Sequence, residues 1–217
     1  MDSPAKSHLP SQGPSSPRLD TTRRRLARRL AVAFASVAVA IVLAAGGWAL
    51  FLQLTGNIHT VEPNELYRSA QLDGDDLARV LNEYKIKSVI NLRGDNPGDA
   101  WYDEELRVTK EYGVQHFDVG IGATSEPEPK VMRRLIGLLR NAPRPLLVHC
   151  YSGADRSGLA AALYEFLVTG ESPRTAAKQL SFWYGHFPWL GSRTIAMDQA
   201  YWKIINGGEY SARSLAD

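Results

Sequence analysis

The feature that most constrains this chain is a stretch without any charged residue at positions 30–54. A helix rises about 1.5 Å per residue, so this stretch reaches the ~30 Å needed to cross the hydrocarbon core of a membrane. A cleaved signal peptide is the alternative, and the small residues at 44–47 favour it. The stretch is long for a signal peptide and continues through Trp48 and Phe51, so we expect an uncleaved transmembrane anchor at 30–54.

Residues 1–29 form a basic head in front of this anchor. They hold seven Lys or Arg against two Asp, a net charge of +5, and the whole chain carries +2, so residues 30–217 carry −3. Pro and Ser dominate residues 1–20, which predicts that 1–29 is a disordered basic tail. The positive-inside rule places this tail in the cytoplasm and, in a bacterial inner membrane, places the C-terminal part in the periplasm.

Residues 55–217 provide enough chain for one domain. Short β-branched or apolar runs alternate there with longer amphipathic stretches, which predicts an α/β fold with a mainly parallel central sheet flanked by helices. The expected strands are 88–92, 114–119 and 145–150, and the expected helices are 74–84, 100–112, 128–141, 157–169, 173–184 and 193–206. A mildly acidic domain without a basic stripe argues against nucleic acid as a partner.

The chemistry-bearing segment is residues 145–167, which read as a buried strand, a loop and a helix. Backbone N–H groups and the helix dipole converge where such a loop enters a helix, so it can bind an anion or stabilise a thiolate. Cys150 begins the loop and is the single cysteine, which excludes an intramolecular disulfide and a multi-cysteine zinc site. Arg156 ends it with a guanidinium fork suited to two phosphate oxygens. Gly153 permits a tight turn, and Gly158 permits close packing of the helix.

Five residues separate Cys150 from Arg156, which Ser157 follows, with His149 before and Gly153 inside. This pattern resembles the signature loop of the cysteine-based protein tyrosine and dual-specificity phosphatase superfamily, in its bacterial membrane-anchored branch with an HCxxGADRSG loop. The resemblance extends over most of residues 60–200. Rhodanese-like sulfurtransferases usually have four residues between Cys and Arg, so the length of this loop favours phosphatase.

The resemblance implies a dual-specificity-phosphatase-like fold and a role for each residue of the signature. Cys150 would be the nucleophile, Arg156 would bind phosphate, and the Ser157 hydroxyl would ease departure of the thiolate. His149 would order the loop from behind. The phosphate-binding loop would consist of Tyr151, Ser152, Gly153, Ala154, Asp155 and Arg156. The implied mechanism is a phosphocysteine pathway that needs no metal and no cofactor.

Family members also need a general acid about thirty residues upstream of the nucleophile. Asp118 lies 32 positions before Cys150, at the carboxyl end of a predicted strand, where the sheet would bring both residues to the same edge. Glu126 and Glu128 on the following loop are alternatives, and Asp155 is a weaker one. We expect the Asp155 carboxylate to repel highly charged substrates such as inositol polyphosphates.

Three further residues admit more than one interpretation. Arg68 and Arg93 follow apolar runs and could hold substrate phosphate, although a solvated position or a structural ion pair explains each at least as well. His186 lies in the aromatic stretch 183–191, which we expect to pack in the core between the last helices, with a site role for His186 as the minor alternative.

The expected function is therefore a membrane-anchored cysteine-dependent phosphomonoesterase of the tyrosine or dual-specificity type. Its substrate would be a phosphoprotein or, because the tether concentrates the enzyme at a membrane, a lipid or envelope-glycan phosphate. A phosphate-binding module without turnover is a second alternative. The loop length and the absence of a resolving cysteine disfavour a sulfur carrier or an arsenate reductase.

Overall fold

The structure, a computed structural model, describes residues 18–207, so the predicted disorder of residues 1–17 lies outside the described range. The chain divides into two compact units between Gly47 and Trp48. Helix α1 (Arg18–Leu54) runs through this boundary and begins at Arg18, so residues 18–29, assigned by sequence to the disordered tail, are helical.

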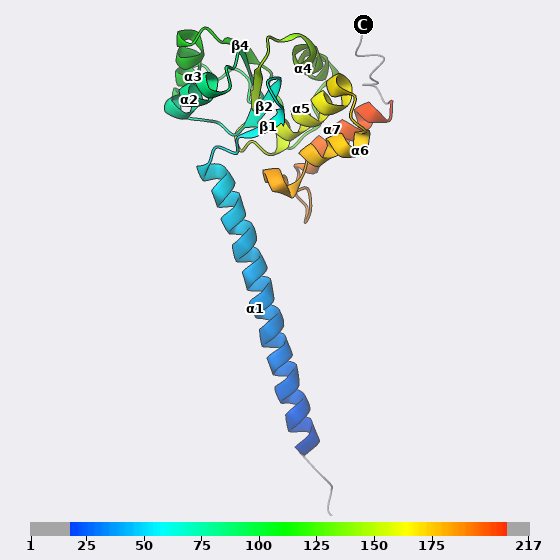
Figure 1. Cartoon of the computed structure of the whole chain (residues 1–217). Coiled ribbons are helices and arrows are strands. Elements are labelled where there is room, and N and C mark those ends of the chain that lie inside the picture. Colours follow the sequence, from blue (N-terminus) through cyan, green and yellow to red (C-terminus); the bar gives the residue numbers. More distant parts are fainter. Residues whose placement is uncertain (1–17, 208–217) are drawn as a thin grey trace, which may run out of the picture. The chain divides into compact units, whose positions relative to one another are not determined.

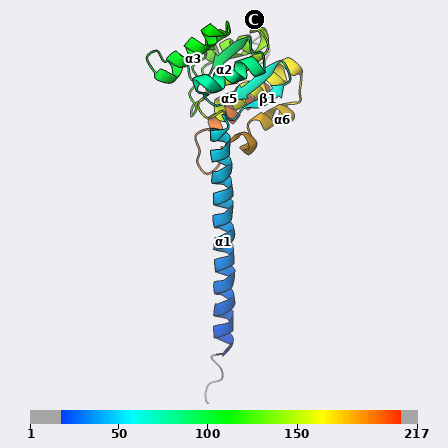
Figure 2. The same cartoon turned by 60° about the vertical axis from the view of Figure 1, so that its left-hand side comes forward.

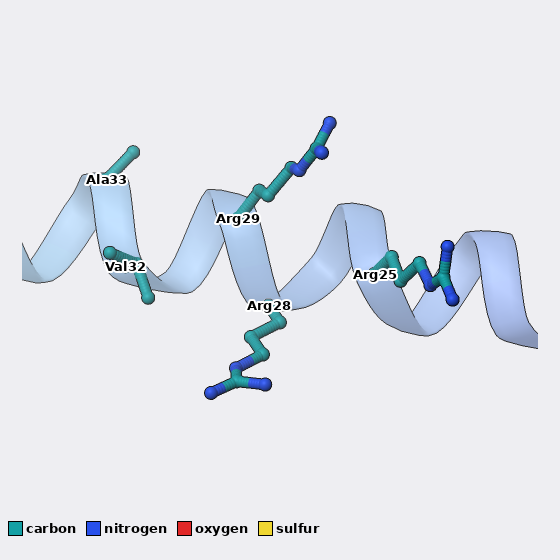
Figure 3. Close-up of a pocket in the computed structure, with 5 residues that line it drawn as sticks. All are labelled: Arg25, Arg28, Arg29, Val32 and Ala33. Atoms are coloured by element: carbon teal, nitrogen blue, oxygen red, sulfur yellow. The ribbon is translucent and has the colours of Figure 1, made fainter.

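Among the described residues, one helical stretch, Thr22–Leu54, is long and apolar enough to cross a membrane. Large apolar side chains along it, Phe34 and Val42 among them, are exposed, whereas Leu52 near its end is buried. Figure 3 shows Arg25, Arg28 and Arg29 in the first part of this stretch, ahead of the uncharged run 30–54, with their guanidinium groups extending outward from the helix. Residues spaced by three and four positions are neighbours on one side of a helix, so these three cations lie on the same side of α1.

The larger unit, residues 48–217, contains a five-stranded sheet with helices on both faces (Figure 1). The strands are β1 (His59–Glu62), β2 (Leu66–Ser69), β3 (Ser88–Asn91), β4 (Gln115–Asp118) and β5 (Leu146–His149). The helices are α2 (Gly74–Glu83), α3 (Ala100–Glu111), α4 (Pro129–Asn141), α5 (Asp155–Tyr164), α6 (Pro173–Ala176) and α7 (Ile195–Ile205), with the short helices η1 (Glu165–Thr169), η2 (Ala177–Gln179) and η3 (Phe182–Tyr184).

The strand order is β1-β2-β5-β3-β4, with every pair parallel except β1 with β2. This confirms the predicted mainly parallel α/β fold. Strands β2, β3 and β5 are buried along their whole length, as expected for a parallel sheet covered on both faces. Strand β5 lies at the centre, so the loop that leaves it opens in the middle of the carboxyl edge.

Two apolar cores hold this sheet between the helices. On one face, Leu146 and Val148 of β5 pack in a core with residues of α4, α5 and α7. On the other face, Leu147 packs in a smaller core with residues of α2 and α3. Successive residues of β5 thus point into opposite cores, which holds the strand from both sides. This packing fixes the position of Cys150, which follows directly in the chain.

Three predictions for the elements differ from the structure. The sequence did not predict β1 and β2 as strands. The expected helix 157–169 begins at Asp155 and, after Tyr164, continues as the π-helix η1. The expected helix 173–184 is broken into α6, η2 and η3, because the Gln179 carbonyl accepts a hydrogen bond from the Arg68 guanidinium instead of continuing a helical ladder.

Candidate functional site

The centre of the candidate site is the 150–156 loop, which joins β5 to α5. Cys150 follows the last residue of β5 and is 1 % exposed. Helix α5 begins at Asp155, so the loop closes directly onto the amino end of a helix. The predicted arrangement of strand, loop and helix is thus confirmed, and it supplies an environment in which backbone N–H groups favour negative charge.

Two glycines give the loop its path. Gly153 has φ +70°, and a Cβ there would lie 2.6 Å from the Ala70 nitrogen and 2.8 Å from the Ser69 carbonyl carbon. A Cβ on Gly158 would lie 2.9 Å from the Gln179 carbonyl oxygen. Both positions exclude a side chain, which agrees with the sequence interpretation of each glycine.

The buried guanidinium of Arg68 supports the loop from below. Its Nη2 donates to the Gly153 and Ala154 carbonyls, each at 2.9 Å, and its Nη1 donates to Gln179. Arg68 is fully buried, and this burial lowers its pKa to about 10 although the nearby Cys150 acts in the opposite direction. Arg68 therefore has a structural position beneath the loop and does not line its open side.

Within the loop, the predicted residues come together. The Cys150 sulfur lies 3.5 Å from the Ser157 hydroxyl. The Arg156 Nη1 lies 3.4 Å from the Leu92 carbonyl and 3.3 Å from the Ile121 carbonyl. These contacts hold the guanidinium at the carboxyl edge of the sheet, beside the chain that follows β3 and the chain that follows β4.

His149 belongs to a buried polar cluster behind the nucleophile position. Its Nε2 lies 3.0 Å from Oε1 of Glu105, and Nε2 of His116 lies 2.7 Å from the same oxygen. The Gln71 amide donates to the other Glu105 oxygen at 2.7 Å. Burial favours the neutral form of Glu105, but the two histidines and Gln71 outweigh it and hold its pKa well below the ordinary value.

Asp118 ends β4 at the same edge of the sheet. Its carboxylate accepts a hydrogen bond from the Asn91 amide at 2.9 Å and from the Tyr102 hydroxyl at 2.7 Å. Asn91 is paired with Asp118 on one side and with His149 on the other, so one strand separates Asp118 from Cys150. Two strand spacings amount to about 10 Å, a gap that a phosphate ester can bridge.

The alternative acids are placed differently. Glu126 is exposed and lies 3.0 Å from the Lys203 ammonium of α7. Glu128 occupies the residue before α4. Neither is on a strand end, so Asp118 has the position that the sheet argument requires.

Asp155, whose carboxylate we expect to repel highly charged substrates, has a partner in the structure. Its Oδ1 lies 2.7 Å from Nδ1 of His186, whose Nε2 lies 2.7 Å from Asp198 on α7. Burial disfavours the charged imidazole, but hydrogen bonds to the two carboxylates outweigh burial and raise the pKa of His186 to about 9. The His186 cation is shared by the carboxylates of Asp155 and Asp198, so it offsets the charge of Asp155 only in part.

The rim of the site is aromatic and cationic. The Arg93 guanidinium lies 3.4 Å from the centre of the Trp101 ring and 5.4 Å from that of Tyr151, which is exposed. Burial and the neighbouring Arg156 both lower the pKa of Arg93. The second cation thus lies near the first, which supports a place for Arg93 at the entrance to the loop.

The loop is also tied to the end of α1. Ser152 accepts hydrogen bonds at its carbonyl from Gln53 at 3.3 Å and from Asn57 at 2.9 Å, and Asn57 donates to the Tyr184 carbonyl as well. We call residues 48–54 the stem. The Gln53 bond joins the candidate site to the stem, which is the last part of the predicted membrane anchor 30–54.

Sequence reasoning missed two partners of the site, Glu105 and Tyr102, and left the role of Arg68 open between phosphate binding and a solvated or structural ion pair. Glu105 and Tyr102 lie on α3 with ordinary helical spacing, and no local signal separates them from surface residues of that helix. The strands β4 and β5 bring His149, His116 and Asp118 to these two side chains. Their role therefore becomes visible only when the strands are paired.

Comparison with known proteins agrees with this geometry. The model of a family described as the tyrosine phosphatase family matches residues 52–174. No curated protein sequence matches the chain significantly.

Several solved structures share the fold. TpbA of P. aeruginosa is 20 % identical, with a TM-score of 0.55 over 75 % of this chain and 92 % of its own. The catalytic core of the PP-IP phosphatase Siw14 of S. cerevisiae is 19 % identical, with a TM-score of 0.51 over 66 % and 85 %. PTPMT1 is 16 % identical, with a TM-score of 0.52 over 74 % and 99 %.

Proposed function

The chain belongs to the tyrosine phosphatase family and is a phosphoric monoester hydrolase, and from this premise we propose that it works through a phosphocysteine formed on Cys150. The observation that carries the proposal is the 150–156 loop, in which Cys150, Ser157 and Arg156 surround one anion-binding turn at the start of α5. Cys150 begins this turn and its sulfur lies 3.5 Å from the Ser157 hydroxyl, which is a suitable position for a nucleophile at the start of a helix.

In the first step, the Cys150 thiolate attacks phosphorus opposite the ester oxygen. The S–P bond forms as the P–O bond breaks, and the electron pair leaves with the ester oxygen. Asp118, in its acid form, gives that oxygen a proton, so the product is an alcohol or phenol. The Asn91 and Tyr102 hydrogen bonds hold the carboxyl group where this transfer takes place.

In the second step, water attacks the phosphocysteine. Asp118, now a carboxylate, takes a proton from the water as the new P–O bond forms and the S–P bond breaks. The Ser157 hydroxyl stabilises the departing thiolate from 3.5 Å. Arg156 and the loop N–H groups bind the equatorial phosphate oxygens in both steps, where transition-state charge gathers. His149, fixed by Glu105, orders the loop.

We also propose that the chain is anchored in a membrane by one helix, with the phosphatase domain at 55–217 on the far side from the basic head. The support is the apolar stretch Thr22–Leu54 and the arginines in its first part, Arg25, Arg28 and Arg29 (Figure 3). By the positive-inside rule, these arginines face the cytoplasm, and in a bacterial inner membrane the phosphatase domain is periplasmic.

Phosphotyrosine is the first substrate class to consider, because a variant of the structural relative TpbA binds it in a crystal. A phosphorylated membrane lipid or envelope glycan is the second, and one specific observation favours it. The 150–156 loop is hydrogen-bonded to Gln53 of the stem, so a membrane anchor would hold the site close to the bilayer surface.

The covalent pathway is tested by partitioning. The full chain in detergent, with chelator, is given aryl phosphates of differing leaving-group acidity in the presence of glycerol. If all of them pass through one phosphocysteine, the ratio of glycerol phosphate to inorganic phosphate is the same for every substrate. A ratio that varies with the leaving group would contradict the shared intermediate.

A further inference from the structure

The prediction that the aromatic stretch 183–191 packs in the core is wrong. We call residues 182–190 the aromatic segment. Its His186 is buried, but its large apolar side chains are solvent-exposed, with Trp183 at 71 % and Leu190 at 95 %. The exposed members are Phe182, Trp183, Phe187, Trp189 and Leu190. Five such side chains in nine consecutive residues form a concentrated apolar surface of the kind that marks an interaction site.

The charged residues that flank the aromatic segment in the sequence are positive. No Asp or Glu occurs between residues 181 and 197, and Arg193 and Lys178 are exposed on its two flanks. Trp side chains with nearby cations are typical of the headgroup region of a membrane, where aromatic rings take the interface and Lys or Arg meets lipid phosphate. This composition favours a lipid surface over an acidic or neutral protein groove.

The aromatic segment is packed against the stem (Figures 1 and 2, orange beside cyan). The Trp48 and Trp183 rings meet edge to face with centres 5.7 Å apart, and the Trp48 indole N–H donates to the Phe182 carbonyl at 3.3 Å. Trp48 belongs to the uncharged run 30–54 and follows Gly47 directly in the chain. The contacts with Trp48 therefore place the aromatic segment beside the last residues of the uncharged run, within one compact unit.

We propose that the aromatic segment lies in the headgroup region of the membrane crossed by α1, as a second membrane contact of the phosphatase domain. This inference rests on the proposed membrane anchor. It adds that the domain does not swing freely on its tether. Because His186 pairs with Asp155 and Asn57 joins Ser152 to the Tyr184 carbonyl, membrane contact of the segment fixes the depth of the 150–156 loop.

The test places an environment-sensitive fluorophore on single cysteines of the full chain. In a Cys150→Ser background, separate variants carry Trp189→Cys or Leu190→Cys in the aromatic segment. Val39→Cys reports the anchor, and Tyr112→Cys, at an exposed position after α3, is the aqueous control. Each labelled chain is reconstituted in phosphatidylcholine and phosphatidylglycerol vesicles, with and without brominated lipid.

The expected result is a blue-shifted emission and a loss of fluorescence to brominated lipid at positions 39, 189 and 190, with neither effect at position 112. If 189 and 190 behave like 112 while 39 is quenched, the anchor stands and this inference is overturned. If position 39 is not quenched, both fail. A blue shift at 189 and 190 that brominated lipid does not quench, and that grows with protein density, would mean that a second copy covers the segment, which also overturns it.

Discussion

The imidazole of His186 lies 2.7 Å from a carboxylate oxygen of Asp155, inside the 150–156 loop. Its other nitrogen contacts Asp198 at the same distance, so one buried cation joins the loop to α7. Nothing in the local sequence pairs these residues, because the rest of α5, the π-helix η1 and the short helices α6, η2 and η3 lie between Asp155 and His186 in the chain. The pairing gives the Asp155 carboxylate a cationic partner beside the 150–156 loop.

This contact predicts a pH-dependent stability at the alkaline end. The folded pKa of His186 is about 9 and its unfolded value is 6.5, so its contribution is complete below about pH 6.5 and is lost as the pH rises through about 9. We expect His186→Asn to lower the free energy of unfolding by about 2 kcal/mol near neutrality. Urea unfolding in detergent measures the difference, which should shrink above about pH 9. A difference that stays constant up to about pH 10 would contradict the ion pair.

Glu105 predicts the opposite pH dependence. Its folded pKa lies below the unfolded value of 4.5, so the stability that it contributes is present above that value and is lost as the pH falls below it. We expect Glu105→Gln to destabilise the protein by about 2 kcal/mol, because a buried charged acceptor is lost to His149 and His116. The acid limb of a stability profile should be flatter in the variant than in the wild type.

Glu104→Gln is the matched control on the same helix. Glu104 is exposed and lies 4.0 Å from Arg107, so its replacement should change stability by less than about 0.5 kcal/mol. If the two substitutions lower the free energy of unfolding equally, the buried hydrogen bonds of Glu105 do not stabilise the fold more than an exposed ion pair does.

Gly153→Ala tests the shape of the 150–156 loop. The added methyl would meet the Ala70 nitrogen at 2.6 Å, so the loop has to move and the N–H groups lose their common focus. We expect a fall in kcat/KM of about 100-fold or more, as for a lost set of oxyanion donors.

Gly170→Ala separates this clash from backbone strain, because Gly170 has φ +80° and a Cβ there would meet nothing within 4 Å. It should cost about 1 kcal/mol of stability and leave kcat/KM unchanged. If both glycine variants lose activity to the same extent, the loop contact is not the cause.

Asp118→Asn tests the general acid. The amide keeps the shape of the side chain but has no proton of suitable acidity to give, so turnover should fall by about 10²- to 10³-fold. The fall should be steeper for alkyl phosphates than for aryl phosphates with acidic leaving groups. Glu126→Gln and Glu128→Gln, at the alternative positions, should leave both rates near the wild-type values. A large loss in either of those variants, with little loss in Asp118→Asn, would reassign the acid.

The site residues that the sequence predicted are recognised from their neighbours in the chain. Cys150 follows an apolar run, and Gly153 and Arg156 stand at fixed distances after it, so one short segment predicts a strand, a turn and a helix. Asp118 was predicted because it ends another strand of the same parallel sheet. The structure places these residues at one edge of the sheet, as the pattern indicated.

The features that the sequence did not predict depend on contacts between residues that are far apart in the chain. Strand β2 contains Arg68, a charge that reads as surface, yet this side chain is fully buried because Gln179, more than a hundred positions later, and the loop carbonyls satisfy it. The same bond interrupts the helix expected at 173–184. The aromatic segment reads as core by composition, and its exposure becomes visible once α7 and the stem are in place.

The most direct test of the account is the hydrolysis of an aryl phosphate by the full chain in detergent, with chelator, for wild type and Cys150→Ser. The hydroxyl is a far weaker nucleophile in the same place, while Arg156 and the loop N–H groups remain to bind substrate. We predict that the wild type turns over and that Cys150→Ser loses at least about 10³-fold in kcat while still binding phosphate. A Cys150→Ser variant that hydrolyses the substrate within about tenfold of the wild-type rate would contradict a phosphocysteine mechanism.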